Sequence, residues 1–217
     1  MYKRQKNWFL IFDSNPKNLL QNHGLMPIPP YLKRDSDSMD LEDYQTVFAS
    51  IDGSIAAPTA GLHFTKKLLD NFKISKDYIT LHVGLGTFLP VKSKNIDDHI
   101  MHEESFFINN KTLKKIQDAK RNRNRILSIG TTSLRAIESL AIDTNQVDKW
   151  SKTNLFITEG FDFQFTDCLL TNFHLPKSTL LILISSFLGY ELTMKCYEIA
   201  LKEKFRFYSY GDAMLIL

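Results

Sequence analysis

Hydrophobic and polar positions along the chain predict a mixture of helices and strands. Short runs rich in apolar and β-branched residues predict strands at residues 8–12, 78–83, 125–129, 154–157 and 168–173. Apolar positions that recur on one helical face predict helices at residues 65–72, 110–122, 133–141, 178–188 and 192–204. No internal repeat or low-complexity linker interrupts this order. The pattern is typical of a mixed α and β domain.

The stretch from residue 26 to residue 43 interrupts this pattern because it is rich in proline and charge. Proline continues neither a helix interior nor a central strand, so we expect a surface loop here. The chain has 217 residues, 43% of them hydrophobic, which is enough for a packed core in one or two domains.

Composition also indicates where the protein works. The apolar run at residues 180–188 is about half of the roughly 18 residues that a membrane span needs, so it predicts a buried helix. The first residues do not resemble a secretory signal, and the two cysteines, Cys168 and Cys196, fit a reducing compartment. We therefore expect a cytoplasmic protein that does not bind a membrane.

The net charge of +3 is small, but positive charge is concentrated at residues 111–125. Asp118 is the single acidic residue there, among the basic residues Lys111, Lys114, Lys115, Lys120, Arg121, Arg123 and Arg125. We call these seven residues the basic strip. Such a strip is typical of a surface that binds phosphates and also of an ordinary solvated helix face, and both interpretations stay open.

Most of the histidines lie in breaks between predicted elements or near the end of one, beside Gly, Pro, Thr or acidic residues. They are His63, His82, His99, His102 and His174. The predicted strand that holds His82 runs into Gly84 and Gly86, and glycine allows a backbone to approach a ligand closely. The strand, glycine and helix order of a dinucleotide fingerprint is absent, so we predict no such site.

Gly130, Thr131, Thr132 and Ser133 follow a predicted strand and open a predicted helix. The free N–H groups at a helix start bind carboxylates and other anions, which predicts an anion site at this turn. An ordinary Thr or Ser helix cap explains the same residues equally well.

A cluster of imidazole and carboxylate groups lies between Asp97 and Glu104. His99, His102, Glu103 and Glu104 suit zinc or iron, but they do not have the His-Glu-x-x-His order of a metalloprotease. Acid–base chemistry or hydrogen-bonded structure is the other interpretation, and we favour it over a metal site.

Several longer motifs carry a resemblance to one enzyme family. In chain order they are MPIPPY, YQTVFA, GSIAAPTAGLHF, TLHVGLGTFLPV, HIMHEE, GTTSLRAIES, TNFHLPKSTLL and RFYSYGDAM. Their sequence and order resemble those of the bacterial S-adenosylmethionine:tRNA ribosyltransferase-isomerases. The resemblance implies transfer and isomerisation of the ribosyl group of S-adenosylmethionine onto 7-aminomethyl-7-deazaguanine in a tRNA. Epoxyqueuosine forms, adenine and methionine are released, and no metal is implied.

The resemblance also implies the fold and the partners. We expect an α+β fold, with a half-barrel-like mixed sheet in the main domain at residues 26–217 and the end of an inserted β-barrel domain at residues 1–25. The expected partner is a tRNA with a GUN anticodon that carries the precursor base. Relatives are longer at the N-terminus, so we expect a truncated monomer, with a complementing N-terminal chain as an option.

Proton transfer in this reaction needs a base near neutral pKa and an acid for the departing adenine, and the sulfonium needs a carboxylate nearby. The expected catalytic residues are His63, His82, His102, Glu103, His174 and Asp212. The methionine carboxylate is expected at Gly130–Ser133 with help from Arg135, through charge-assisted hydrogen bonds. The full set of expected substrate-binding residues is Gly84, Gly86, Thr87, Phe88, Gly130, Thr131, Thr132, Ser133, Arg135, Asn172 and Lys177.

Two other functions remain open from the sequence. An inactive fragment of such an enzyme would bind tRNA through the basic strip and release no adenine. A metal-dependent hydrolase would use His99, His102 and Glu103.

Overall fold

The computed structural model describes residues 2–4, 7–84 and 95–217. The chain divides into two compact units, Met1–Glu42 and Asp43–Leu217. The first unit contains the antiparallel strands β1 (Tyr2–Arg4) and β2 (Asn7–Phe9), the helix α1 (Pro16–His23), the short 3-10 helix η1 (Pro30–Leu32) and most of α2 (Asp40–Asp43).

Local chemistry fixes the short elements of the first unit. The side chain of Asn15 accepts a hydrogen bond from the Lys17 N–H at 3.0 Å, and Pro16 follows at the first helical position, so α1 begins there. Arg34 donates two hydrogen bonds to the buried carboxylate of Asp40, at 2.7 and 2.8 Å. The assignment of residues 1–25 to the end of a barrel stays a prediction.

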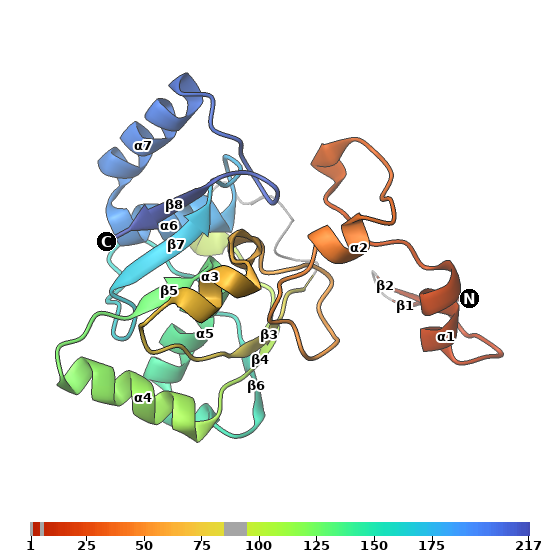
Figure 1. Ribbon diagram of the computed structural model, residues 1–217, viewed down its shortest axis with the longest axis horizontal. Helices are drawn as coiled ribbons and strands as arrows, with labels where there is room; N and C mark the ends of the chain where they lie inside the picture. Colours follow the sequence, from red (N-terminus) through yellow and green to blue (C-terminus); the bar gives the residue numbers. More distant parts are fainter. Residues whose placement is uncertain (1, 5–6, 85–94) are drawn as a thin grey trace. The chain divides into compact units, whose positions relative to one another are not determined.

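The second unit contains two three-stranded sheets and a set of helices (Figure 1). One sheet is antiparallel and has the order β3 (Thr80–His82), β4 (Glu104–Phe107), β6 (Trp150–Thr153). The other has the order β5 (Leu127–Ile129), β7 (Cys168–Asn172), β8 (Ala213–Ile216), with β5 parallel and β8 antiparallel to β7. The helices are η2 (Thr59–His63), α3 (Lys66–Asn71), η4 (Ile96–Asp98), α4 (Asn110–Arg121), α5 (Thr131–Ile142), η5 (Thr144–Gln146), α6 (Thr179–Leu188) and α7 (Tyr190–Lys202). The α+β class predicted from the sequence is confirmed.

Helix α5 lies between the two sheets and joins their cores (Figure 1). On one side Ile137 and Leu140 pack in a cluster with Phe106 of β4. On the other side Leu134 packs in a cluster with Leu169 of β7 and residues of α6. Because apolar burial contributes about 25 cal/mol per Å², a helix buried on both sides supplies much of the stability of this unit.

Each predicted helix is present, and the helix ends follow their caps. Asn109, Thr65 and Ser178 accept hydrogen bonds from first-turn N–H groups at the starts of α4, α3 and α6. No single helix within the described ranges is long and apolar enough to cross a membrane. Together α6 and α7 pass the test of length and composition, but the chain bends by 114° between them.

The strand predictions were less accurate. Residues 154–157 are not a strand, because the strand lies just before them at Trp150–Thr153, where polar and apolar residues give no continuous apolar run. The sequence also failed to reveal β4, whose first residue is an acid, and β8, whose edge position leaves Leu215 exposed.

Candidate functional site

The candidate site lies where the parallel strands β5 and β7 end. Parallel strands present their carboxyl ends at the same edge of a sheet, and ligands of α/β sheets bind there. After β5 the chain turns at Gly130, whose N–H donates to the Leu170 carbonyl at 2.8 Å. Gly130 has a φ of 88°, a left-handed conformation that favours glycine, and α5 begins directly after it. After β7 come Phe173 and His174.

The 3-10 helix η2 covers this edge and is held there by Asn172. The Thr59 hydroxyl lies 2.9 Å from Oδ1 of the buried Asn172 side chain, and its Nδ2 lies 3.3 Å from Nε2 of His63. An amide nitrogen only donates, so in this orientation the neutral His63 ring accepts at Nε2 and carries its proton on Nδ1. Asn172 therefore positions an imidazole that is itself exposed.

The third part of the site is the turn from Arg206 to Asp212. Backbone N–H of Tyr208 donates to the Phe173 carbonyl at 2.9 Å, which fixes the turn to the end of β7. A Cβ on Gly211 would lie 2.5 Å or less from backbone atoms of Arg206 and Phe207, so the turn closes only around a glycine. The Gly211 carbonyl lies 3.5 Å from Nδ2 of Asn172.

Asp212 closes the turn through three hydrogen bonds to Arg206. Its carboxylate accepts from the Arg206 backbone N–H and from Nη2, both at 2.8 Å, and its own N–H donates to the Arg206 carbonyl at 2.8 Å. The hydrogen bonds from Arg206 hold the pKa of Asp212 below its ordinary value of 3.8, so the carboxylate stays ionised at neutral pH. Charge-assisted pairs of this geometry fix the direction of the guanidinium.

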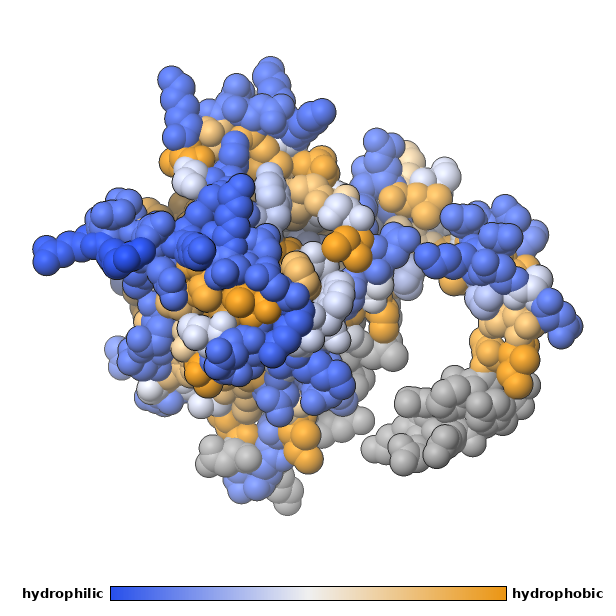
Figure 2. All heavy atoms as spheres, turned by 90° about the horizontal axis from the view of Figure 1, so that it is seen from below, coloured by the Kyte–Doolittle hydropathy of each residue, from blue (hydrophilic) through white to orange (hydrophobic). Residues whose placement is uncertain are grey.

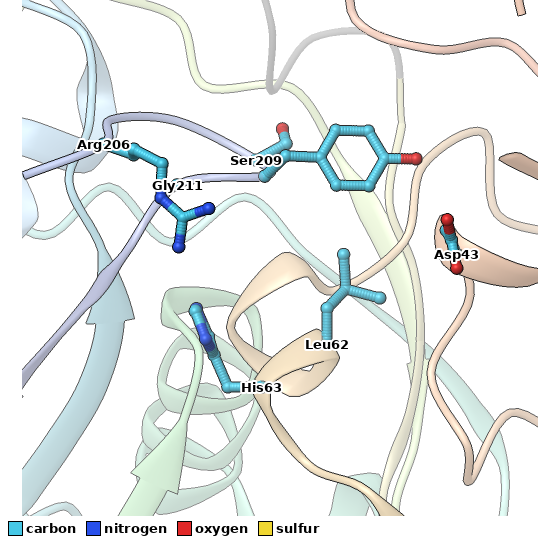
Figure 3. A pocket seen from close by; sticks show the side chains of 7 residues that line it. Asp43, Leu62, His63, Arg206, Ser209 and Gly211 are labelled. Carbon is cyan, nitrogen blue, oxygen red and sulfur yellow. The ribbon is translucent and has the colours of Figure 1, made fainter.

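These parts enclose a pocket with a volume of about 290 Å³ (Figure 3). His63 projects from η2 and Arg206 from the turn toward the same space, and Asp43 faces them from the end of α2 (Figure 3). The walls also include Leu62, Ser209, Tyr210 and Gly211. An open pocket with an imidazole, a guanidinium and one carboxylate offers proton transfer and recognition of charge.

His174 lies next to this edge in a different environment. Its backbone N–H donates to the Tyr197 hydroxyl at 2.9 Å, and Nε2 of its ring lies 3.0 Å from the Thr171 hydroxyl. The residue keeps some exposed surface, but protein atoms surround the ring, and burial lowers its pKa from 6.5 to about 4. Burial likewise raises the pKa of Tyr197 to about 12. At neutral pH both side chains are uncharged.

His82 lies on the other sheet, in β3. Its ring stacks on Trp150 with a centroid distance of 4.7 Å. Gly53 has a φ of 146° and approaches this ring so closely that a Cβ would lie 2.6 Å from Cε1. Nδ1 of His82 is buried and has no hydrogen-bond partner among the described residues. Gly84 follows β3, whereas Gly86, Thr87 and Phe88 lie outside the described residues.

The remaining predicted residues do not lie in the pocket. Glu103 forms an exposed ion pair with Lys152 at 2.9 Å, His102 is exposed, and Lys177 is exposed with a φ of 58°. His99 packs against Phe156. Within the described ranges, no three His, Cys, Asp or Glu side chains gather in a way that would hold a metal ion, so the metal-hydrolase alternative gains no support.

Arg135 is buried below the start of α5. Its Nη1 donates to Glu104 at 2.5 Å and its Nε donates to the Leu155 carbonyl at 3.0 Å; both charged side chains are 2% exposed. Burial lowers the pKa of Arg135, and the charge of Glu104 opposes this shift. Nη2 is buried without a partner in the described part of the chain. The guanidinium therefore contacts β4 and the Leu155 segment rather than the pocket.

A family model described as a queuosine biosynthesis protein matches residues 1–216. The chain belongs to the queuosine biosynthesis family. The resemblance predicted from the motifs is thus confirmed.

Relatives named S-adenosylmethionine:tRNA ribosyltransferase-isomerase show how much of such a protein the chain spans. The relative from Dichelobacter nodosus is 46% identical over 96% of this chain and 60% of its own length. The relative from Polynucleobacter necessarius is 48% identical over 94% of this chain and 59% of its own length. The chain spans about 60% of the length of the relatives it matches.

A solved structure from Thermotoga maritima, described as an S-adenosylmethionine tRNA ribosyltransferase, has the same fold. It matches with a TM-score of 0.58 and 37% identity, over 73% of this chain and 51% of that one. This similarity supports the α+β arrangement within the queuosine biosynthesis family.

Sequence reasoning missed Arg206 and did not predict the burial of Glu104. Arg206 lies within the motif RFYSYGDAM, six residues before Asp212, and a turn between them brings the two charges together. Glu104 was interpreted as part of the cluster of imidazole and carboxylate groups at residues 97–104, but alternating burial along β4 turns it into the core. The signal for Arg206 was the turn residue Gly211; no comparable signal marked Glu104.

Proposed function

We propose that this chain transfers and isomerises the ribosyl group of S-adenosylmethionine onto 7-aminomethyl-7-deazaguanine in a tRNA. Epoxyqueuosine is the modified product, and adenine and methionine are released. The proposal takes residues 26–217 as the catalytic part of a monomeric cytoplasmic protein. S-adenosylmethionine is the ribosyl donor, and the tRNA has a GUN anticodon.

The observation that carries this proposal is the position of His63. Four motifs that are far apart in the sequence meet at one edge of a sheet, and an exposed imidazole lies there beside a pocket with Asn172 fixing its ring. A sulfonium acidifies the neighbouring ribosyl carbon, so an imidazole at this place removes or returns a proton near neutral pH. His63 is therefore our choice for the group that transfers the proton.

His174 is less suited to that role. With a pKa of about 4 it stays neutral at physiological pH, and it is a poor acid for the departing adenine because it lacks the acidic proton of an imidazolium. We assign His174 to positioning the end of β7. Its backbone N–H binds Tyr197, and its ring Nε2 binds Thr171. His82 lies on the other sheet and Glu103 lies just before its strand β4, and we propose no direct chemical step for them.

The basic strip supports tRNA as the partner. Three of its members form ion pairs: Lys115 with Asp77, Lys120 with Asp167, and Arg121 with Asp118. The other four have no ion pair within the described ranges and are exposed: Lys111, Lys114, Arg123 and Arg125. Hydrophilic side chains cover much of the face on the side of α4 (Figure 2). Free cations are the ones that displace counterions from a phosphate backbone.

An adenine-release assay tests the proposed activity. It combines the purified chain, S-adenosylmethionine and a tRNA that carries the precursor base, and adenine is quantified by chromatography. His63→Gln should lower the rate by about 100-fold or more, because general acid–base groups contribute 10²–10⁴-fold. His102→Gln is the matched control, since this histidine is exposed outside the pocket, and it should keep the rate.

Two results would contradict the proposal in different ways. Unchanged adenine release by His63→Gln would remove His63 from the chemistry. A chain that binds tRNA and S-adenosylmethionine but releases no adenine would show that it does not have the proposed activity.

A further inference from the structure

The pocket beside His63 has opposite charges on facing walls. The Arg206 guanidinium reaches into it from the 206–212 turn, and the Asp43 carboxylate faces it from the end of α2 (Figure 3). Asp43 is exposed and forms no ion pair or side-chain hydrogen bond with another described residue. Asp212 lies behind Arg206 and binds it. A ligand in this space meets a cation on one side and an anion on the other.

We propose that this pocket binds the amino-acid end of a sulfonium substrate, with the α-carboxylate on Arg206 and the ammonium group facing Asp43. The inference rests on the proposed function, because that function supplies a substrate with such an end. It adds two residues, Arg206 and Asp43, and replaces the start of α5 as the place of the carboxylate.

Arg206 is prepared for this contact. A guanidinium has five N–H donors in a fixed plane, and the intramolecular side-chain bond of Arg206 to Asp212 uses one of them. The side chain is 77% exposed, so its other donors remain available to a ligand. Because the Arg206 backbone is bound to the same carboxylate, the arginine is oriented before the ligand arrives, which lowers the entropic cost of binding.

The charges favour a zwitterion with an added positive charge over a phosphate. Arg206, Asp43 and Asp212 sum to a charge of −1 at neutral pH. A sulfonium amino acid carries one carboxylate, one ammonium and one sulfonium, so its charge is +1 and complements the pocket. A phosphate would be attracted by Arg206 but repelled by both carboxylates, and like charges in one site are unfavourable.

The start of α5 offers less room for a carboxylate. Gly130 and Thr131 are buried, and Ala60 of η2 packs against the turn: a Cβ on Gly130 would lie 3.6 Å from the Ala60 Cβ. Arg135, expected to assist there, is bound to Glu104 instead. Two of the four residues at this turn are thus buried, whereas the side chain of Arg206 is exposed.

The size of the pocket indicates that it takes one part of the substrate. Pockets for whole small molecules usually measure about 300–1,000 Å³, and this one, at about 290 Å³, lies at the lower limit. An amino-acid group fits such a space and leaves the nucleoside outside it, next to His63.

A binding cycle between variants and substrate analogues tests the proposal. Calorimetry would measure the Kd of S-adenosylmethionine and of its decarboxylated analogue for the unsubstituted chain and for Arg206→Gln. The variant should bind S-adenosylmethionine roughly tenfold or more weakly, as expected for a lost hydrogen bond between charged groups, and should bind the decarboxylated analogue no more weakly than the unsubstituted chain does. Asp43→Asn should show the same selectivity toward a deaminated analogue.

Arg121→Gln is the matched control, because Arg121 is also an exposed arginine bound to one aspartate, here Asp118. It should leave every Kd unchanged. Thermal melting of each variant confirms that it is folded, and Arg206→Lys, which keeps the charge but loses the planar fork, should recover part of the affinity.

Each outcome decides between the inference and the proposed function. If Arg206→Gln loses affinity equally for both ligands, or loses none, the inference is overturned, and adenine release is then a separate question. If Arg206→Gln loses affinity for S-adenosylmethionine alone, and the chain releases no adenine in the tRNA assay, the inference is supported and the proposed activity is overturned. A chain that binds neither ligand would overturn both.

Discussion

The two arginine–carboxylate pairs of the second unit have similar chemistry and opposite surroundings. Arg135 and Glu104 join α5 to β4 and are each 2% exposed. Arg206 and Asp212 close a turn at the sheet edge, and their side chains are 77% and 31% exposed. The first pair is shielded from water and bonded to other protein groups. The second pair stays hydrated, and Arg206 keeps N–H donors that no described protein group uses.

This difference separates stability from recognition. A buried ion pair loses solvation, so removing one partner leaves an uncompensated charge in the core. An exposed pair is screened by water and contributes little to folding, but it holds a charged group in a fixed direction toward a ligand. The chain therefore uses one arginine to hold α5 to β4 and to the Leu155 segment, and the other to face the pocket.

The largest expected effect is that of breaking the buried pair. Arg135→Met should lower the free energy of unfolding by about 3–5 kcal/mol, because Glu104 is left charged in the core. Urea unfolding followed by circular dichroism measures the loss. Replacing both partners, Arg135→Met with Glu104→Leu, should restore most of it, since a well-packed apolar pair is often as stable as the ion pair.

Arg206→Met is the control for this prediction and should shift the urea midpoint far less. The comparison between the two pairs would fail if Arg135→Met and Arg206→Met destabilised the protein equally.

The second prediction concerns the pH dependence of stability near the sheet edge. The pKa of His174 is about 4 in the folded protein and 6.5 when unperturbed. The unfolded chain therefore binds a proton between these values while the folded one does not. The stability from this residue is complete above pH 6.5, falls as pH decreases through the window and levels off below about 4, with a total change of up to about 3 kcal/mol.

Unfolding measured between pH 4 and 7 checks this, with His174→Gln as the test variant. The variant should lose stability less steeply over the window than the unsubstituted chain. Parallel slopes in His174→Gln and the unsubstituted chain would contradict the burial of a neutral His174.

The contrast between these regions also explains what the sequence predicted well. Helices with a cap residue and a regular apolar face, such as Asn109 before α4 and Ser178 before α6, were found close to their true bounds. Their signals are local: a cap lies next to the turn it stabilises. The same holds for β7, which begins with three apolar residues and is largely buried in the sheet.

Long-range contacts explain what the sequence did not predict. His63 and Asn172 were both named as site residues, but their contact spans 109 positions and depends on how η2 packs over β7. Arg135 was expected to bind a ligand because it follows a helix start. Its burial depends on Glu104, which lies 31 positions earlier in an unpredicted strand. Charge and spacing show that a residue has the chemistry to bind a ligand or transfer a proton. Only packing shows where its side chain points.

The third prediction extends the comparison to the basic strip, which contains both paired and unpaired cations. Replacing Lys111, Lys114, Arg123 and Arg125 with Gln should weaken tRNA binding and reduce the slope of log K against log salt by roughly 3, because these cations displace counterions from phosphates. Filter binding at several salt concentrations measures the slope.

The matched control replaces the paired members, Lys115, Lys120 and Arg121, with Gln. These cations already face aspartates, so their removal should change the salt slope less. Equal changes of the salt slope in the two sets would indicate that ion pairing does not decide which cations contact RNA. No change in either set would indicate that the strip is an ordinary solvated helix face.

The smallest expected effect on folding is that of Asp212→Asn, and it separates the two pairs most sharply. Arg206 holds the pKa of Asp212 below 3.8, so the stability from this pair is present above that value and is lost as pH falls through the lowered folded-state pKa. Above pH 5 the variant should show almost no change in its urea midpoint, because the pair is exposed and screened. Its affinity for S-adenosylmethionine should nevertheless fall, because Arg206 is no longer held toward the pocket. Asp118→Asn, which breaks the exposed pair with Arg121, is the control and should change neither quantity. A large loss of stability in Asp212→Asn without a loss of affinity would show that this pair, like the buried one, serves the fold rather than the ligand.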